Sequence, residues 1–264
     1  MMSHLKKTIL AFGLLTFNSF AATPEQVEQY LTVSNSEEEL ISLESQFSAM
    51  QKNIQQIDSN ATKSKTYDMQ MLSLRFKDYL EKNISEDEMT EILENYKNVV
   101  LLQFVSASSE AETADPAAIK SYLSTLEKSE ESKARMNIVE KISKEFYSKE
   151  GIMVLFNDLM KPLIEKGIGG HKIDKKILKK MQESYIKMMT EASQGITLYA
   201  SKDFTIAELN ELLKVAQTPA MDHEVKAVFG AMAYALKEYF MSLANRYDVK
   251  KHQSNDTQVP KKIK

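Results

Sequence analysis

Two pairs of glutamates at three-residue spacing are the residues whose types and positions could most readily do chemistry. They are Glu88 with Glu91 and Glu208 with Glu211. Two carboxyl groups on one helix face can act as general acid and general base. The first member of each pair, however, stands three residues after a hydroxyl, on Ser85 or Thr205, which is the spacing of a helix capping box. We therefore interpret these glutamates as capping partners and predict no catalytic residue.

Histidine and cysteine offer little for a metal site. Beyond residue 22 the histidines are His171, His223 and His252, and the chain has no cysteine. The segment "DHEVK" at 222–226 contains His-Glu but lacks the second histidine that a zinc-binding helix places four residues later. The sequence also lacks a Gly-x-Ser-x-Gly motif and a phosphate-binding loop. We predict a protein that is not an enzyme, has no metal or cofactor, and exposes His223 at its surface.

A stripe of lysines lies in "KIDKKILKKMQ", residues 172–182. Its members recur at steps of three and four residues and so share one helix face. They are Lys172, Lys175, Lys176, Lys179 and Lys180. An ordinary solvated helix face would account for them. The alternative is contact with an anionic surface, such as lipid headgroups, a cell-wall polymer or an acidic partner.

Methionines at helical spacing are abundant between residues 153 and 241. Six are candidates for lining an apolar ligand site: Met153, Met160, Met181, Met188, Met189 and Met232. Methionine side chains adapt to varied apolar ligands, but they also fill ordinary helical cores. Both interpretations stay open at this point.

Two Asn-x-Ser/Thr sequons have an acidic residue two positions before the asparagine. They are "DSNAT" around Asn60 and "EKNIS" around Asn83. This pattern resembles the longer acceptor site of a bacterial periplasmic oligosaccharyltransferase. Asn60 lies in a polar segment where a glycan would fit, so N-glycosylation is one hypothesis for both asparagines.

Residues 1–22 have the organisation of a signal peptide. A short basic start precedes the apolar stretch "TILAFGLLTF" (Thr8–Phe17), and small residues follow, so we expect cleavage after Ala21 or Ala22. Ten residues are too few to span a bilayer, which takes about 20. Without a cysteine there is no lipobox anchor. We predict a periplasmic or secreted protein without a transmembrane segment after cleavage.

The charge distribution argues against a nucleic-acid partner. Residues 22–248 carry 27 basic and 36 acidic side chains, whereas residues 249–264 carry five lysines and one aspartate. Phosphate contacts need a basic footprint, and the body of the chain is acidic. The partner we expect is a protein or a component of the cell envelope.

The apolar spacing is helical almost throughout, with seven glycines and five prolines in 264 residues. Four segments fit capping boxes: "TPEQ" from Thr23, "SEEE" from Ser36, "SEDE" from Ser85 and "TIAE" from Thr205. Asp115, Ser148, Asp174 and Thr218 are further candidate caps. We expect "KGIGG" to end a helix and Pro162 to kink one or end it early.

One helix-capping motif occurs twice, as "NISEDEMTEIL" at 83–93 and "DFTIAELNELL" at 203–213. Ile84 and Phe204 would be the hydrophobic staples of the two copies. The duplication predicts an all-α helical bundle built from two related modules. We place the signal peptide at 1–22, module 1 at 23–112, a helical connector at 113–148, module 2 at 149–248 and a disordered basic tail at 249–264.

The second copy, "FTIAELNELLKVAQTP" (Phe204–Pro219), resembles an uncharacterised family of exported bacterial helical proteins. The family motif runs Phe-Thr-x-x-Glu-Leu-x-x-Leu and continues to a Ser/Thr-Pro. The matching positions are Phe204, Thr205, Glu208, Leu209, Leu212, Thr218 and Pro219. The Gly-x-Lys that usually follows is absent after Pro219. The resemblance implies an all-helical periplasmic protein and supplies no catalytic residue.

These observations favour a non-catalytic exported binding or scaffold protein that recognises its partner through helical surfaces. The alternative is a carrier that holds a lipid or other apolar molecule between the methionine-rich helices. A carrier requires a cavity, whereas a scaffold requires an exposed apolar patch.

Overall fold

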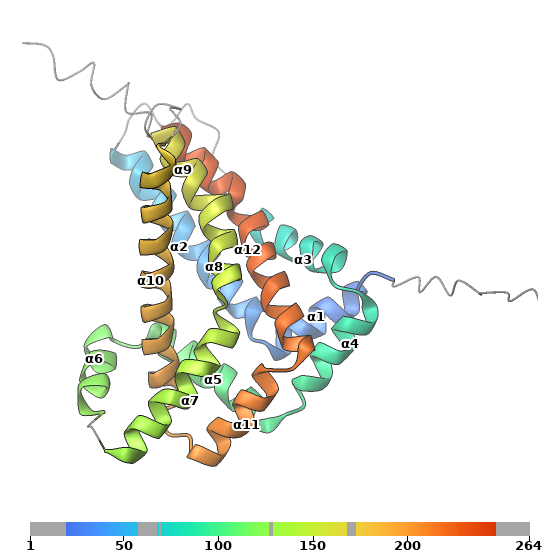
Figure 1. Ribbon diagram of the computed structural model, residues 1–264. Helices are drawn as coiled ribbons and strands as arrows, with labels where there is room; N and C mark the ends of the chain where they lie inside the picture. The colour runs from blue at the N-terminus through green and yellow to red at the C-terminus, as the bar shows by residue number, and fades with distance from the viewer. Residues whose placement is uncertain (1–19, 58–67, 69, 127–128, 168–172, 247–264) are drawn as a thin grey trace, which may run out of the picture.

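The computed structural model describes residues 20–57, 68, 70–126, 129–167 and 173–246. Over these residues the protein is all-helical, as the apolar spacing predicts, and the one extended pairing is an isolated bridge between Ala21 and Ser85. The helices are α1 (Pro24–Val33), α2 (Ser36–Ile57), α3 (Met71–Asn83), α4 (Glu86–Asn95), α5 (Val99–Thr113), α6 (Pro116–Thr125), α7 (Glu130–Phe146), α8 (Lys149–Leu155), the π-helical turn η2 (Phe156–Met160), α9 (Lys161–Gly167), α10 (Lys175–Ala200), α11 (Ile206–Ala216) and α12 (Pro219–Arg246). Figure 1 shows α12 running between α3 on one side and α8 on the other.

Side-chain caps begin most of these helices where the sequence places them. Ser85 Oγ accepts the amide of Glu88 at 3.3 Å, and the Glu88 carboxylate accepts the Ser85 amide at 2.9 Å. Thr205 and Glu208 repeat the arrangement at 3.2 and 2.7 Å. Each box satisfies amides that the first helical turn would otherwise leave unpaired. Thr23 forms a third box, and Asp115, Ser148, Asp174 and Thr218 also cap helices.

The capping box expected at Ser36 is wrong. Ser36 is the first residue of α2 rather than its cap, and Asn35 before it has a positive φ of 60°. Asparagine tolerates this left-handed conformation better than most residues, and here it turns the chain from α1 into α2. The Asn35 side chain is held by a 2.7 Å hydrogen bond to Ser109 Oγ. Consequently the Glu39 carboxyl is not used as a capping partner.

The helix around Pro162 is interrupted by a π-helical turn just before the proline and then continues through it, so it does not end early there. The π-helical turn η2 lies between α8 and α9 and ends two residues before Pro162, which cannot donate a backbone hydrogen bond. α9 then ends at Gly167, the first glycine of the predicted stop. The three segments together pack along α12.

Two glycines allow α12 to lie close to its neighbours. A Cβ added to Gly230 on α12 would stand 2.3 Å from the hydroxyl of Tyr79 on α3. A Cβ added to Gly151 on α8 would stand 2.4 Å from Cδ2 of Phe229 on α12. Both separations are shorter than any van der Waals contact, so these approaches require glycine.

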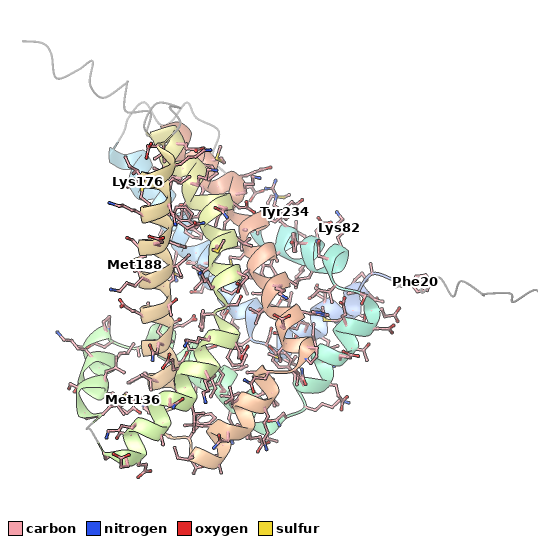
Figure 2. The ribbon with its side chains drawn as sticks, in the orientation of Figure 1. Phe20, Lys82, Met136, Lys176, Met188 and Tyr234 are labelled. Carbon is pink, nitrogen blue, oxygen red and sulfur yellow. The ribbon has the colours of Figure 1, made fainter. Side chains whose placement is uncertain are left out.

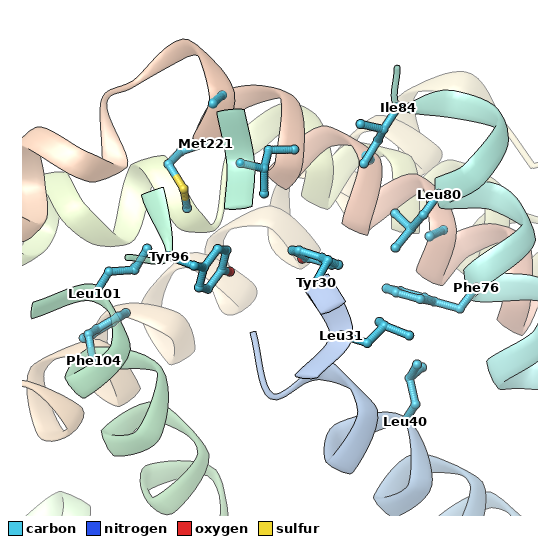
Figure 3. Close-up of a cluster of buried hydrophobic side chains, with 14 of the residues drawn as sticks. Tyr30, Leu31, Leu40, Phe76, Leu80, Ile84, Tyr96, Leu101, Phe104 and Met221 are labelled. Atoms are coloured by element: carbon cyan, nitrogen blue, oxygen red, sulfur yellow. The ribbon is translucent and has the colours of Figure 1, made fainter. Parts of the chain in front are cut away.

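One hydrophobic core joins helices from both halves of the chain. Figure 3 shows part of it, with Tyr30 and Leu31 of α1 between Phe76 of α3 and Tyr96 at the end of α4. Met221 of α12 reaches the same cluster. The Tyr30 and Tyr96 rings meet edge to face with centroids 5.9 Å apart, a favoured aromatic geometry.

Hydrogen bonds join the turn that follows the first copy of the capping motif to the second copy and to the residues just after it. Asn95 donates a 2.9 Å hydrogen bond to Thr218 Oγ1, and Asn98 donates one of 2.9 Å to Glu211. Both contacts join the turn after α4 to the corresponding region around α11. The two copies therefore contribute to one bundle, and the module boundaries at 113 and 149 remain a prediction. In the part of the chain described, no helix combines the length and apolar character needed to cross a membrane.

Candidate functional site

A cavity of about 260 Å³ opens between α1, α2, α5, α7 and α12. Its lining residues are Tyr30, Ser34, Ser36, Glu39, Tyr96, Leu101, Phe104, Val105, Ser108, Glu112, Phe146, Tyr147, Glu224, Val225, Val228 and Phe229. Apolar and aromatic walls with a few polar groups are typical of small-molecule sites. We take this cavity as the candidate functional site.

A buried carboxyl group lies on the inner wall of the cavity. Glu224, on α12, is only 5% exposed. Its Oε1 accepts hydrogen bonds from Tyr30 at 2.9 Å and from Tyr96 at 2.5 Å. Its Oε2 is buried and has no hydrogen-bond partner among the described residues. A buried polar atom without a partner is costly, so this oxygen is chemically prepared to receive a donor.

The ionisation of these groups is strongly perturbed. Burial raises the pKa of Glu224 to about 7, and the hydrogen bonds from Tyr96 and Tyr30 oppose this rise only in part. Burial, with the nearby Glu224 charge, raises the pKa of both tyrosines well above the usual range. At neutral pH the tyrosines therefore keep their protons, while Glu224 is present in both its protonated and its ionised form.

Two further carboxyl groups, less buried than Glu224, also line the cavity. Glu39 on α2 is half-buried, and Glu112 on α5 is exposed. Burial raises the pKa of Glu39 to about 7, and the charge of Glu112 adds to this effect. Partial desolvation by the surrounding side chains raises the pKa of Glu112 as well, although part of this side chain stays exposed. Tyr147 lies close by, since burial and then these two carboxylates raise its pKa to about 12.

Aromatic side chains form the apolar part of the wall. Phe104 of α5 stacks on Phe146 of α7 with ring centroids 5.4 Å apart and planes 17° apart. The ring of Phe229 on α12, which also lines the cavity, lies so near Gly151 of α8 that a Cβ at that position would overlap it. The cavity thus combines aromatic faces with three carboxyl groups.

This arrangement can bind a ligand and exchange a proton with it. No histidine or lysine is among the described lining residues, so the side chains with a pKa near 7 in this cavity are the carboxyl groups of Glu39 and Glu224. In the parts of the chain that the structure covers, no three His, Cys, Asp or Glu side chains are grouped so as to hold a metal ion. The volume and the lining of the cavity are suited to binding a small molecule.

The first glutamate of each pair, Glu88 or Glu208, has the capping role assigned from the sequence. The hydrogen bond from the Ser85 amide lowers the pKa of Glu88, and that from Thr205 lowers the pKa of Glu208. His223 is partly exposed and contacts Glu88 Oε1 through Nδ1 at 3.0 Å. This contact ties α12 to α4 at the surface, away from the cavity lining.

The lysine stripe lies on the outer side of α10. Lys175, Lys176, Lys179 and Lys180 are exposed, and Lys179 approaches Glu183 at 3.8 Å. Figure 2 shows Lys176 at the edge of the molecule. Lys172 lies outside the described residues. Contact with an anionic surface stays a prediction.

The six methionines do not line this cavity. Met188 is 56% exposed on α10 (Figure 2), and the others are partly buried: Met153, Met160, Met181, Met189 and Met232. A ligand lining made of methionines elsewhere stays a prediction. Asn83, at the end of α3, is exposed and donates to the Tyr79 carbonyl at 2.8 Å. Asn60 lies outside the described residues, and glycosylation of both asparagines stays a prediction.

The residues that matter most here were not singled out from the sequence. Glu224 stands in "MDHEVKAVF" on the same face as Met221, Val225 and Val228, so a charged residue interrupts an apolar stripe. That interruption is the feature of the sequence that could have pointed to Glu224. Its partners are 194 and 128 positions away and could not be paired from periodicity.

The comparisons with known proteins identify no relative of this chain. No protein-family model, no curated protein and no solved structure matches the chain. The likeness of Phe204–Pro219 to a family of exported helical proteins therefore stays a prediction.

Proposed function

We propose that this chain is an exported, non-catalytic binding protein that holds a small ligand in the cavity between α1, α2, α5, α7 and α12. The observation that carries the proposal is the buried Oε2 of Glu224, which has no hydrogen-bond partner among the described residues and belongs to a side chain that lines the cavity. A binding site of this kind is completed by its ligand, which supplies the missing hydrogen-bond donor. This role is closer to the carrier that the sequence leaves as the alternative than to the scaffold expected first, although none of the six candidate methionines lines the cavity.

Export is the part of the proposal that depends on residues 1–22. Ala22 is buried at 4% exposure, and its amide donates a 2.9 Å hydrogen bond to the Ile84 carbonyl. Cleavage after Ala21 would keep this donor as the new amino terminus. The periplasmic or secreted location is part of the proposal and depends on the signal-peptide pattern of residues 1–22.

The test is the mass of the protein purified from its own host, measured under native and then under denaturing conditions. We expect native protein to carry extra mass that denaturation removes. Val105 of α5 lines the cavity, and Val105→Trp should fill it and abolish the extra mass. Leu102→Trp is the matched control, because Leu102 lies on the same helix but is 39% exposed.

Two results would contradict the proposal. One is wild-type protein at bare polypeptide mass under both conditions. The other is extra mass that survives in Val105→Trp as fully as in Leu102→Trp, which would place the bound molecule elsewhere.

A further inference from the structure

We propose that the ligand is a small organic cation, an ammonium group on an apolar or aromatic body, whose charge pairs with Glu224 at the inner wall of the cavity. This inference rests on the proposed binding function and names the class of ligand. The ammonium would donate to Glu224 Oε2, and the body would lie against Phe104, Phe146 and Phe229. The cavity volume of about 260 Å³ suits a small molecule of this kind.

The charge of the cavity selects against other ligand classes. Its lining includes Glu39, Glu112 and Glu224, and no lysine, arginine or histidine is among the described lining residues. An anion would be repelled by the carboxylates. A neutral apolar ligand would leave the buried oxygen of Glu224 as unpaired as it is in the free protein, so it would gain no binding free energy from this group.

The hydrogen-bond inventory identifies a donor as the missing group. The hydroxyls of Tyr30 and Tyr96 both donate to Oε1 of Glu224, and the Ser34 hydroxyl donates to Ser36. An ionised carboxylate oxygen can only accept, and no described donor reaches Oε2, so a donor supplied by a ligand would satisfy it. An ammonium group offers up to about three N–H donors together with the opposite charge.

The aromatic walls suit the same ligand. Cations are attracted to the faces of aromatic rings, and the ring stack of Phe104 on Phe146 borders the cavity beside the carboxyl groups. An inorganic cation fits less well, because it requires several oxygen ligands at once. Among the described residues no such group of side chains occurs.

Protons should compete with this cation. The titratable groups that line the cavity are Tyr30 of α1, Glu39 of α2, Tyr96 after α4, Glu112 of α5, Tyr147 after α7 and Glu224 of α12. The pKa values of Glu39 and Glu224 both lie near 7, so these carboxyls ionise as the pH rises through neutrality. Cation affinity should therefore increase with pH over that range.

The experiment is calorimetric titration of the full chain with three probes of similar shape: phenethylammonium, phenethyl alcohol and phenylpropionate. We expect the cation to bind at least about tenfold more tightly at about pH 8 than at about pH 5.5, where its ammonium group stays charged. Phenethyl alcohol should bind more weakly without this pH dependence, and phenylpropionate should not bind. Glu224→Gln should weaken cation binding at least about tenfold at the higher pH and leave the alcohol within about twofold.

The outcomes separate this inference from the proposed function. Binding of the alcohol or of phenylpropionate in preference to the cation would overturn the cation inference and leave a cavity that binds ligands. No binding by any of the three would count against the proposed function as well. The alcohol also reports whether Glu224→Gln keeps a folded cavity, and Glu39→Gln, which should lower cation affinity by a smaller factor, is the second variant.

Discussion

The free energy of unfolding of Glu224→Gln, measured relative to wild type, should increase by about 2–3 kcal/mol between pH 5 and alkaline pH. Burial raises the pKa of Glu224 from its ordinary 4.5 to about 7. The folded state thus holds this proton more tightly than the unfolded state does. The stability that the protonated group contributes is complete below pH 4.5 and is lost as the pH rises through about 7.

Urea unfolding of wild type and Glu224→Gln at several pH values measures this effect. Gln keeps a carbonyl oxygen for the two tyrosines but cannot ionise, so the difference in free energy of unfolding should grow from pH 4.5 to 7 and then level off. Tyr30→Phe should shift the pH dependence of stability to higher pH, whereas Glu224→Gln should abolish this contribution to it. The Tyr30 substitution removes one donor that favours the carboxylate, so it should extend the loss of stability to higher pH. A pH-independent difference between wild type and Glu224→Gln would contradict the buried, proton-exchanging carboxyl.

Gly151→Ala should destabilise the protein by about 1–3 kcal/mol. The new Cβ would stand 2.4 Å from Cδ2 and 2.6 Å from Cγ of Phe229, within the ring rather than at the end of a flexible chain. The overlap outweighs the roughly 1 kcal/mol that alanine gains over glycine in a helix. Phe229 would move, and because it lines the cavity, binding should weaken too.

Gly195→Ala provides the matched control for this prediction. The added Cβ meets Cδ1 of Leu123 at 3.5 Å, an ordinary contact, so alanine should stabilise α10 by up to about 1 kcal/mol. Thermal unfolding of both variants gives the comparison. Equal stability of Gly151→Ala and Gly195→Ala would mean that α8 and α12 do not approach as closely as described.

The predictable part of the fold is the part determined by local chemistry. The boxes at Ser85 and Thr205 follow from residues three positions apart, and both are observed. The box expected at Ser36 failed because Asn35 adopts a left-handed conformation and moves the start of α2 by one residue. That choice depends on the contact of Asn35 with Ser109, which no local pattern encodes.

The site is the part that local patterns could not supply. Glu39 was assigned to a capping box, and it lines the cavity instead. Glu224 was visible as a charge within an apolar stripe, yet its meaning depends on Tyr30 and Tyr96 from distant helices. Tertiary pairing of this kind gives a charged residue a role that sequence spacing alone does not reveal.

The most direct test of a carboxylate-centred ligand site is the carbon NMR titration of the Glu224 side-chain carboxyl, without and with phenethylammonium, assigned through Glu224→Gln. The account predicts a pKa near 7 in the free protein and a fall of about one unit or more on saturation with the cation, because a cation favours the ionised form. An ordinary pKa in the free protein, or a pKa that does not move when the cation is added, would contradict it.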